Sequence, residues 1–284
     1  MGVLRHDGGM PTGSGLLAVR SSGPLDSYLP TVGHIFRVFD AQDSGCISYG
    51  VRTGDNSRWF VKSATTPAGA RSLDRAREFH TRIRHTAVIP VRHSFTAANR
   101  PALVYPWVDG QVLYHPTVHT RPDRTAPTAP MAHFRRLPLP LVHQALERIL
   151  QAHLVIAAAG FVGVDLYDGC FLYDFARDRM HLCDLDEYRP GPFTLGTERL
   201  PGSTRYMAPE ETTAGAEINE RTTVYALGRA IRLLMDSGDA ESAWRGTSDQ
   251  LRVVEQATAA DPTLRYSTVH ELCTRWRAAT RHMG

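Results

Sequence analysis

The spacing of apolar residues changes once along this chain, and this change limits the folds that the chain can adopt. From about residue 28 to 105, runs of β-branched and aromatic residues alternate with turn residues, as in "HIFRVFDA", "CISYGVRTGDN", "SRWFVKSA" and "PALVYPWV". This pattern predicts short strands, and the "TGDN" turn predicts a hairpin. After residue 138 the apolar residues recur at helical spacing, most clearly in "LPLVHQALERILQAHLVIAAAG". The sequence therefore predicts an α+β protein, with a sheet-rich part followed by a helical part.

The same pattern predicts five segments. Residues 1–27 are rich in Gly and Ser without a sustained period, which indicates a flexible tail. Residues 28–105 form a small sheet with one helix in "SLDRAREFHTRIRH", and residues 106–110 form a short connection after it. Residues 111–138 are rich in Pro, Thr, His and Arg, which favours a loop or insertion. Residues 139–284 form the helical part.

Two further helices are expected in the helical part. One covers residues 219–235, with Asn219 as its N-cap. The other begins at "STVHELCTRWRAA", where Thr268 and Glu271 have the spacing of a capping box.

Composition excludes several classes of partner. The formal charge is +3 with a pI near 8.7, and no dense basic run occurs, so we expect no nucleic-acid partner. No apolar stretch approaches the roughly 18 residues of a membrane span, and no signal-peptide pattern begins the chain. The four cysteines have no CxxC spacing, which favours free thiols in the cytoplasm over disulfides or a zinc site.

Lys62 is the only lysine among the 32 Lys and Arg residues of the chain. It follows the apolar run Trp59-Phe60-Val61 at the end of a predicted strand. A lysine there can extend along the strand end to reach water. It can also place a slender point charge where the wide, planar guanidinium of arginine does not fit, as between two phosphates. Because arginine serves almost everywhere else in this chain, we favour the functional interpretation.

Two aspartates each lie next to a short apolar strand. Asp165 precedes the predicted strand Phe171-Leu172-Tyr173, and Asp184 follows the apolar run that ends at residue 183. Turns favour aspartate, so each one alone is compatible with a solvated turn. Together, 19 residues apart, they indicate a pair of carboxylates at one edge.

Five stretches, taken in order, resemble the motifs of protein kinases. They are the strand lysine Lys62, the loop aspartate Asp165, the aspartate Asp184, "MAPE" after "GST", and Arg265 in "DPTLRYS". The stretches "ISYGV", "WFVKSA", "VDLYDGCFLYDF" and "MAPEE" are similar to a bacterial serine/threonine-kinase-like group. The resemblance covers residues from about 30 to 280. It implies a bilobal kinase-like fold, with a small antiparallel sheet lobe carrying one helix, a mainly helical lobe, and a cleft between them.

The resemblance also implies ATP and Mg²⁺, or Mn²⁺, as cofactors. Lys62 would bridge the α- and β-phosphates and pair with Glu78, the only glutamate on the predicted helix. Asp165 would accept the hydroxyl proton or orient the acceptor, and Asp184 would hold the metal. Glu210 of the Ala-Pro-Glu motif would pair with Arg265.

The nucleotide-binding residues are implied in the same way. The stretch "AQDSGCISYGV" would lie along the nucleotide with Ser44, Gly45, Ser48 and Val51. Backbone groups from Pro106 to Val108, in the hinge "YPWVDG", would meet the adenine, and proline costs nothing at 106 if only its carbonyl is used.

The catalytic loop departs from the kinase pattern. Gly163-Val164 replaces His-Arg before Asp165, so we expect activity without activation-loop phosphorylation. Tyr167 replaces the serine/threonine-kinase lysine. Cys170 replaces the metal-binding asparagine, and a neutral thiol is a poor ligand for Mg²⁺. Asp168 or Asp186 can supply the missing oxygen, or a single Mg²⁺ suffices.

Two other departures concern the scaffold. The phosphate loop contains Gly45 and Gly50 but not the Gly-x-Gly-x-x-Gly pattern. Thr223 stands where kinases place an aspartate that anchors the catalytic loop, and its hydroxyl can still bind backbone.

Three functions remain open on the sequence. The first is transfer of the γ-phosphate of ATP to a Ser/Thr hydroxyl of a protein or peptide. The second is phosphorylation of a small molecule or a biosynthetic precursor peptide, which the loss of lysine at Tyr167 and the insertion allow. The third is a pseudokinase that binds nucleotide or acts as a scaffold, which Cys170 favours and the retained trio Lys62, Asp165 and Asp184 opposes.

Overall fold

The computed structural model describes residues 15–196 and 199–281, and these residues form an α+β protein. Contacts divide it into two compact units. The first contains the residues up to Arg77 and Pro90–Trp107, and the second contains Glu78–Ile89 and the chain from Val108. The chain passes finally from the first unit to the second after residue 107, inside the segment 106–110 predicted as a connection. Residues 78–89, which the sequence places in the sheet-rich part, belong instead to the second unit.

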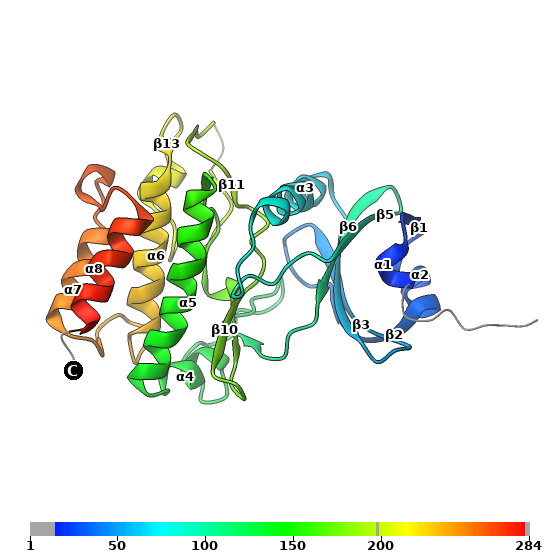
Figure 1. Ribbon diagram of the computed structural model, residues 1–284, viewed down its shortest axis with the longest axis horizontal. Coiled ribbons are helices and arrows are strands. Elements are labelled where there is room, and N and C mark those ends of the chain that lie inside the picture. The colour runs from blue at the N-terminus through cyan, green and yellow to red at the C-terminus, as the bar shows by residue number, and fades with distance from the viewer. Residues whose placement is uncertain (1–14, 197–198, 282–284) are drawn as a thin grey trace, which may run out of the picture. The chain divides into compact units, whose positions relative to one another are not determined.

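The first unit is built around a six-stranded sheet with the order β1-β5-β6-β4-β3-β2 (Figure 1). All of its neighbouring strands are antiparallel except β1 and β5. The predicted "TGDN" hairpin is confirmed, because β3 and β4 pair antiparallel across it. The elements along this part of the chain are α1 (Gly15–Ala18), β1 (Ser21–Ser22), α2 (Leu25–Val32), β2 (Gly33–Phe39), β3 (Cys46–Thr53), β4 (Arg58–Ala64), α3 (Pro67–Arg82), β5 (His93–Ala97) and β6 (Arg100–Pro106).

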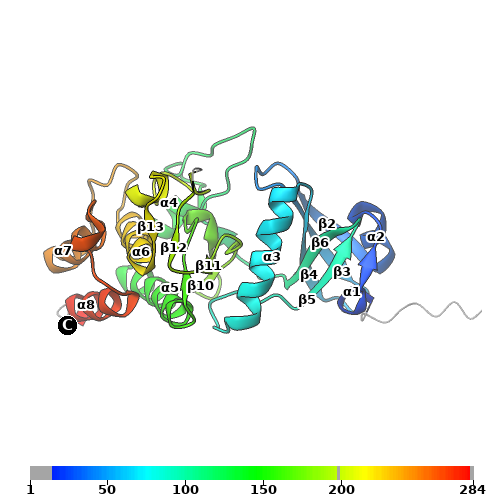
Figure 2. The same ribbon diagram turned by 90° about the horizontal axis from the view of Figure 1, so that it is seen from above.

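The tail predicted for residues 1–27 is wrong from Gly15 onward, and residues 1–14 lie outside the described part. Helices α1 and α2 pack on one face of the sheet (Figures 1 and 2), and β1 adds an edge strand beside β5. Leu16, Leu25 and Leu29 are buried in a core with strand residues of that face. Three leucines separated by Gly, Ser and Pro have no clear period, so the pattern did not reveal them.

The second unit is mainly helical and also contains short strand pairs (Figure 2). Hairpin β9–β10 with β7 forms a three-stranded sheet, and β8–β11 and β12–β13 form two pairs. Its elements are β7 (Gln111–Val112), α4 (Pro130–Arg135), α5 (Leu139–Ala158), β8 (Phe161–Val162), η1 (Asp168–Cys170), β9 (Phe171–Asp174), β10 (Arg179–Leu182), β11 (Arg189–Pro190), β12 (Phe193–Thr194), η2 (Pro209–Thr212), β13 (Glu217–Ile218), α6 (Glu220–Leu234), α7 (Ser248–Ala257), η3 (Pro262–Leu264) and α8 (Val269–Arg281), where η marks a 3₁₀ helix.

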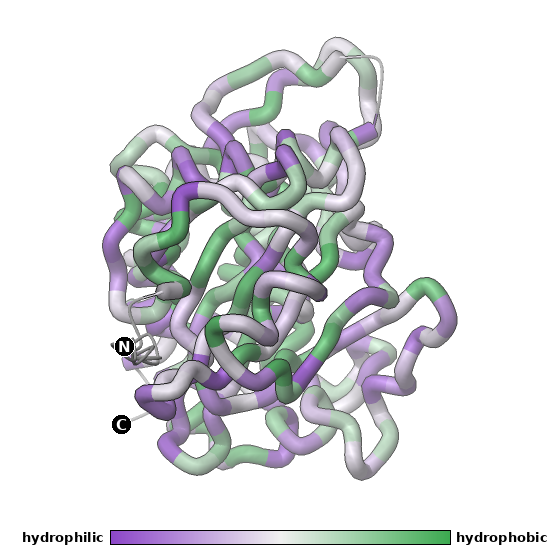
Figure 3. Tube along the Cα trace, turned by 90° about the vertical axis from the view of Figure 1, so that its right-hand side faces the viewer, coloured by the Kyte–Doolittle hydropathy of each residue, from purple (hydrophilic) through white to green (hydrophobic). Residues whose placement is uncertain are grey.

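The predicted helices of this unit are confirmed as α5, α6 and α8, whereas α7 was not predicted. Apolar and hydrophilic residues alternate along the trace (Figure 3), and the apolar positions of these helices share one core with β9 and β10. Asn219 caps α6 by accepting the Arg221 N–H. At α8 the Thr268 hydroxyl accepts the Glu271 N–H at 3.1 Å, but the Glu271 carboxylate binds Ser267 rather than completing the predicted box.

The loop predicted for residues 111–138 is only partly a loop. Gln111 and Val112 pair with β9, and Leu113 and Tyr114 are buried. Helix α4 buries Met131 and other residues in the core of the second unit. The irregular part is the segment 115–129, hereafter the Thr/Pro segment. None of the described helices combines the length and apolar composition that crossing a bilayer requires.

Candidate active site

Lys62 lies in the middle of the first unit's sheet. It stands on β4 opposite Ser48 of β3 and Leu103 of β6, and only 8% of its surface is exposed. Neighbouring residues of a strand point to opposite faces. Since Val61 packs in the core beneath α1 and α2, Lys62 lies on the other face of the sheet. The lysine that the sequence singled out is therefore held away from the apolar core.

Aromatic rings share the face of Lys62. Phe60 lies within 5.7 Å of the Phe39 ring and 6.1 Å of the Tyr105 ring, measured between centroids. Phe36 and Trp107 pack edge to face at 4.7 Å, directly over Gly50, where a Cβ would lie 2.7 Å from the Phe36 ring. Such rings offer flat faces on which a planar ligand can stack.

Val51 does not lie on this face. It is fully buried in the core beneath α1 and α2, opposite Trp59 of β4. Its assignment to the same site as Lys62 therefore loses its support, because one step along a strand reverses the face. Gly50 occupies the position on the side of Lys62.

The turn before β3 is tight and depends on Gly45. Gly45 has φ +66°, and its carbonyl accepts the N–H groups of Thr65 and Thr66. A Cβ at Gly45 would lie 2.2 Å from the Thr66 hydroxyl oxygen. In this turn Ser44 is exposed, whereas Ser48 on β3 is buried beside Lys62.

The other residues predicted for the nucleotide site are Pro106, Val108 and Glu78. They lie near the positions where the chain passes from one unit to the other. Pro106 ends β6 opposite Trp59 in the first unit, and Val108 begins the second; both are half-buried. Glu78 lies on α3, and its carboxylate is 3.8 Å from Arg82, with both side chains about half exposed (54% and 53%). The pairing of Lys62 with Glu78 stays a prediction.

Asp165 and Asp184 flank the same end of the β9–β10 hairpin. Phe171 begins β9 and pairs with Leu182, the last residue of β10, so the loop before β9 and the residues after β10 meet there. Asp165 has φ +58° and Asp184 has φ +57°. Left-handed backbone is uncommon outside glycine and is often found at functional sites, although aspartate tolerates it better than most residues. The two carboxylates that the sequence paired therefore come from two adjacent, strained turns.

Cys170 connects these two turns. Its thiol lies 3.4 Å from the main-chain oxygen of Asp165 and 3.7 Å from that of Asp184, and the residue is fully buried. Burial, followed by the charges of Asp184 and Asp165, raises the pKa of the Cys170 thiol well above its ordinary value. The thiol therefore stays protonated and donates to the main chain. Cys170 therefore acts as an internal link between the two turns, which gives no support to a role as a metal ligand.

Asp168 has a different partner from the one predicted. Its carboxylate accepts Nε of Arg124 at 2.6 Å and Nη2 at 3.4 Å, and the residue is 1% exposed. A carboxylate neutralised in this way is a poor metal ligand, so the expectation of Mg²⁺ at Asp168 loses its support. Asp186 is also buried, just after Asp184. Within residues 15–196 and 199–281, no cluster of three or more His, Cys, Asp or Glu side chains forms a preformed metal site.

The loop of Asp165 is fixed from below by Thr223 on α6. The Gly163 N–H donates to the Thr223 hydroxyl at 2.9 Å, as the sequence suggested. Tyr188 packs beside Gly163, and its hydroxyl lies 2.8 Å from Nε2 of His153. Complete burial lowers the pKa of His153 to about 4, so this histidine is neutral.

The predicted pair of Arg265 and Glu210 is confirmed. Two guanidinium nitrogens of Arg265 lie 2.7 and 2.9 Å from the two oxygens of Glu210, and both side chains are buried. A bidentate pair fixes the relative position of its elements, here η2 and the turn after η3. The Thr222 hydroxyl also donates to Glu210 at 2.9 Å.

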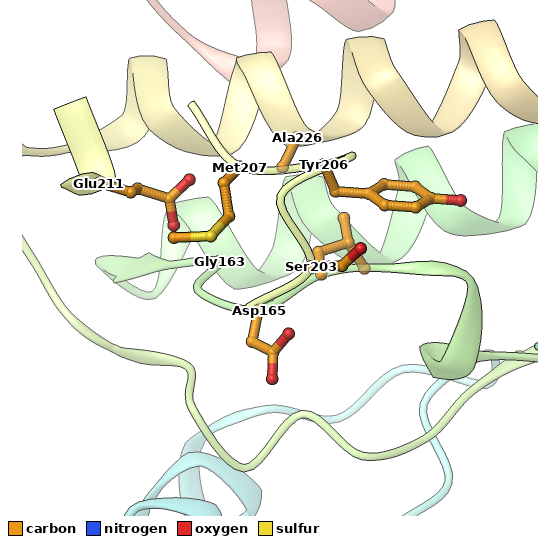
Figure 4. A pocket seen from close by; sticks show the side chains of 8 residues that line it. Gly163, Asp165, Ser203, Tyr206, Met207, Glu211 and Ala226 are labelled. Carbon is orange, nitrogen blue, oxygen red and sulfur yellow. The ribbon is translucent and has the colours of Figure 1, made fainter. Parts of the chain in front are cut away.

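A small hollow beside Asp165 was not predicted. It is partly open to solvent and encloses about 190 Å³ when this open space is included, and Figure 4 shows Ala226 of α6 on one side and Asp165 on the other. Ser203 and Glu211 also line it. Burial is the main cause that raises the pKa of Glu211 to about 7, while the Ala208 N–H, 2.7 Å away, favours the ionised form. The sequence signal for this hollow is the pair of consecutive glutamates after Ala-Pro, Glu210 and Glu211. Only the fold shows that both are buried.

The fold is α+β, and the site contains two aspartates with left-handed backbone whose main-chain oxygens are joined by the buried Cys170 thiol. The comparisons give it no family. No protein-family model matches the chain, and no curated protein matches it significantly.

Proposed function

We propose that the protein is an ATP-dependent phosphotransferase of protein-kinase type that transfers the γ-phosphate to a Ser/Thr hydroxyl of a protein or peptide in the cytoplasm. One observation carries the proposal: Asp165 and Asp184 lie at the same end of one hairpin, both with left-handed backbone, and are tied together by Cys170. Phosphoryl transfer is dominated by positioning and charge stabilisation, and this arrangement supplies positioned charge.

Each residue has a role in the proposal. Asp165 accepts a hydrogen bond from the acceptor hydroxyl and orients its oxygen. Lys62 binds the α- and β-phosphates with a single ammonium group. The rings beside Lys62 stack on the base, and backbone groups of Pro106 to Val108 bind its edge.

The donor set fits Mg²⁺ or Mn²⁺ held together with a nucleotide. Mg²⁺ is usually bound through one or two carboxylates plus substrate phosphates, rather than by a cage of protein ligands. Asp184 would hold it, with Asp186 two residues further along the chain, and Asp168 is paired with Arg124. When bound, the ion would neutralise charge on the phosphates.

Supporting evidence comes from the scaffold around the loop. Thr223 anchors Gly163, and the Arg265–Glu210 pair joins the two stretches that the kinase resemblance predicted to be joined. The order of the motifs predicts these contacts. A protein of the same fold without catalytic activity would also have them.

A second candidate function is nucleotide binding without transfer. It is favoured by Cys170, whose thiol contacts main-chain oxygens, and by the pairing of Asp168 with Arg124. Because Cys170 and Asp168 have other partners, Asp184 and Asp186 are the predicted metal ligands that remain.

A transfer assay separates the candidates. The purified protein is incubated with γ-labelled ATP and Mg²⁺ or Mn²⁺, with and without a generic protein acceptor, alongside Asp165→Asn. Asparagine tolerates left-handed backbone, so the variant removes charge without adding strain. Label on polypeptide that disappears in the variant supports the proposal. Thermal stabilisation by Mg·ATP without labelled polypeptide points to a small-molecule acceptor or a nucleotide-binding scaffold. The absence of stabilisation by any nucleotide contradicts both candidates.

A further inference from the structure

The Thr/Pro segment reaches the catalytic loop through one side chain. Residues 118–123 of the segment are exposed, but the side chain of Arg124 is only 16% exposed. Its guanidinium carbon lies 3.3 Å from the ring centroid of Tyr114, which is buried. Stacking on a ring restricts the guanidinium plane, and Nε and Nη2 then face the carboxylate of Asp168.

Asp168 depends on this contact because it is buried. A carboxylate without a cation or hydrogen bonds is costly to bury, and Arg124 supplies both. The charge of Asp168 also favours the protonated form of Arg124, whose pKa is raised in spite of burial. The pair therefore fixes the place of Asp168 within the fold.

Asp168 is the first residue of η1, which ends at Cys170. The turn is short and closed by its own hydrogen bond, from the Cys170 N–H to the Tyr167 carbonyl at 2.9 Å. A shift of Asp168 is therefore passed to Cys170. The thiol of Cys170 in turn contacts the main-chain oxygens of Asp165 and Asp184. A continuous series of contacts thus runs from the Thr/Pro segment to the main chain of Asp165 and of Asp184.

We infer that Arg124 is a positioning residue, which holds Asp165 and Asp184 in their working places through Asp168, η1 and the Cys170 thiol. The effect of Arg124 on catalysis rests on the proposed function, whereas the series of contacts from Arg124 to Cys170 does not. The Thr/Pro segment then has a role, because a partner or a modification that acts on this segment would change the position of the catalytic loop.

The first measurement is steady-state phosphotransfer by Arg124→Ala, Arg124→Lys and the control Arg121→Ala. Arg121 is exposed and lies three residues away in the same segment. Misplacement of a reacting group by about 1 Å can cost about a hundredfold in rate. We expect kcat to fall about tenfold to a hundredfold in Arg124→Ala, with KM for ATP changed less than about threefold. Lysine should restore part of kcat, and Arg121→Ala should match the wild type.

The second measurement does not require activity. A thiol reagent is added to each variant, and labelling of individual cysteines is followed by mass spectrometry. Cys273 is a matched control, because it is equally buried and its thiol faces the Leu150 carbonyl far along the chain from η1. We expect Arg124→Ala to speed labelling of Cys170 by about tenfold or more, with Cys273 unchanged, because local opening exposes the thiol.

The outcomes are distinguishable. Unchanged Cys170 labelling in Arg124→Ala overturns the inference, even if the enzyme is active. Faster labelling of Cys170 and Cys273 together means that the whole unit has loosened, and this also overturns it. If Arg124→Ala does not fold, Arg124→Lys, which keeps the charge, and Asp168→Asn, which keeps the shape of the carboxyl group, must show selective Cys170 labelling. Absence of phosphotransfer by the wild type overturns the proposed function but leaves the labelling result decisive for the link.

Discussion

At the scale of single residues, the proposed function depends most closely on the shape of the cationic head group at Lys62. It lies between Ser48 and Leu103 on neighbouring strands and is 8% exposed, so little space surrounds the ammonium group. Lys62→Arg keeps the charge but widens the head group. We predict at least about a tenfold loss of ATP affinity, measured by calorimetry, with a melting temperature close to that of the wild type. Arg52→Lys, on the exposed hairpin, is the control. Equal ATP affinity in Lys62→Arg would show that the lysine is replaceable.

Glu211 makes stability depend on pH. Its pKa rises from an ordinary value of 4.5 to about 7, mainly because burial disfavours the charged form, and Glu210 adds to this while Arg265 and Arg199 oppose it. The folded state therefore binds more protons than the unfolded chain between these values, so this stabilisation is complete below about pH 4.5 and is lost as pH rises through 7.

The test is Glu211→Gln, which keeps an oxygen for the Ala208 N–H without ionising. From pH 5 to pH 8, the variant should gain about 3 kcal/mol relative to the wild type in urea unfolding. Parallel stability curves for the two proteins over this range would contradict a raised pKa.

At the scale of elements, the pair of Arg265 and Glu210 joins η2 to the turn after η3. Arg265 also donates to the carbonyls of Ala259 and Ala260 and lies over the Tyr225 ring. Removing one partner of a buried pair leaves the other charge uncompensated. We predict that Arg265→Ala lowers the free energy of unfolding by about 3–5 kcal/mol. Arg252→Ala removes an exposed pair with Asp249 and should have little effect. A small effect of both variants would mean that the buried pair does not hold these elements.

The turn before β3 depends on glycine for two reasons. Gly45 has positive φ, and its missing side chain leaves room for Thr66. Gly45→Ala should lower the free energy of unfolding by about 1–3 kcal/mol, measured by urea unfolding. Gly54, in the β3–β4 hairpin, has nothing within 4 Å of a Cβ, so Gly54→Ala is the matched control. Equal stability of the two variants would indicate that the turn is not strained.

How much the sequence predicts differs between elements for physical reasons. Helices α5 and α6, the β3–β4 hairpin and the Asp165–Asp184 edge follow from period and local order, so they were predictable. The assignment of Val51 to the site of Lys62 loses its support because a strand reverses its face at every residue. The ion pair of Arg124 and Asp168 joins residues 44 positions apart, so no local sequence pattern predicts it. Helix α1 was missed because its leucines follow Gly and Ser, and burial against the sheet stabilises it rather than propensity.

At the scale of the whole molecule, the two units contribute different chemistry. The first provides a lone lysine on a sheet face lined with rings, and the second provides two carboxylates at a hairpin end. Neither set alone binds and activates a triphosphate in the proposal. The proposed function therefore requires residues of both units to act on the same nucleotide.

A double-mutant cycle on Mg·ATP affinity tests this claim most directly. The dissociation constant is measured by calorimetry for the wild type, Lys62→Met, Asp184→Asn and the double variant. If both residues act on one nucleotide, each single change weakens binding about tenfold or more, and the double variant loses at least about 1 kcal/mol less than the sum of the two. Two independent, additive losses, or affinity unchanged by either substitution, would contradict the account.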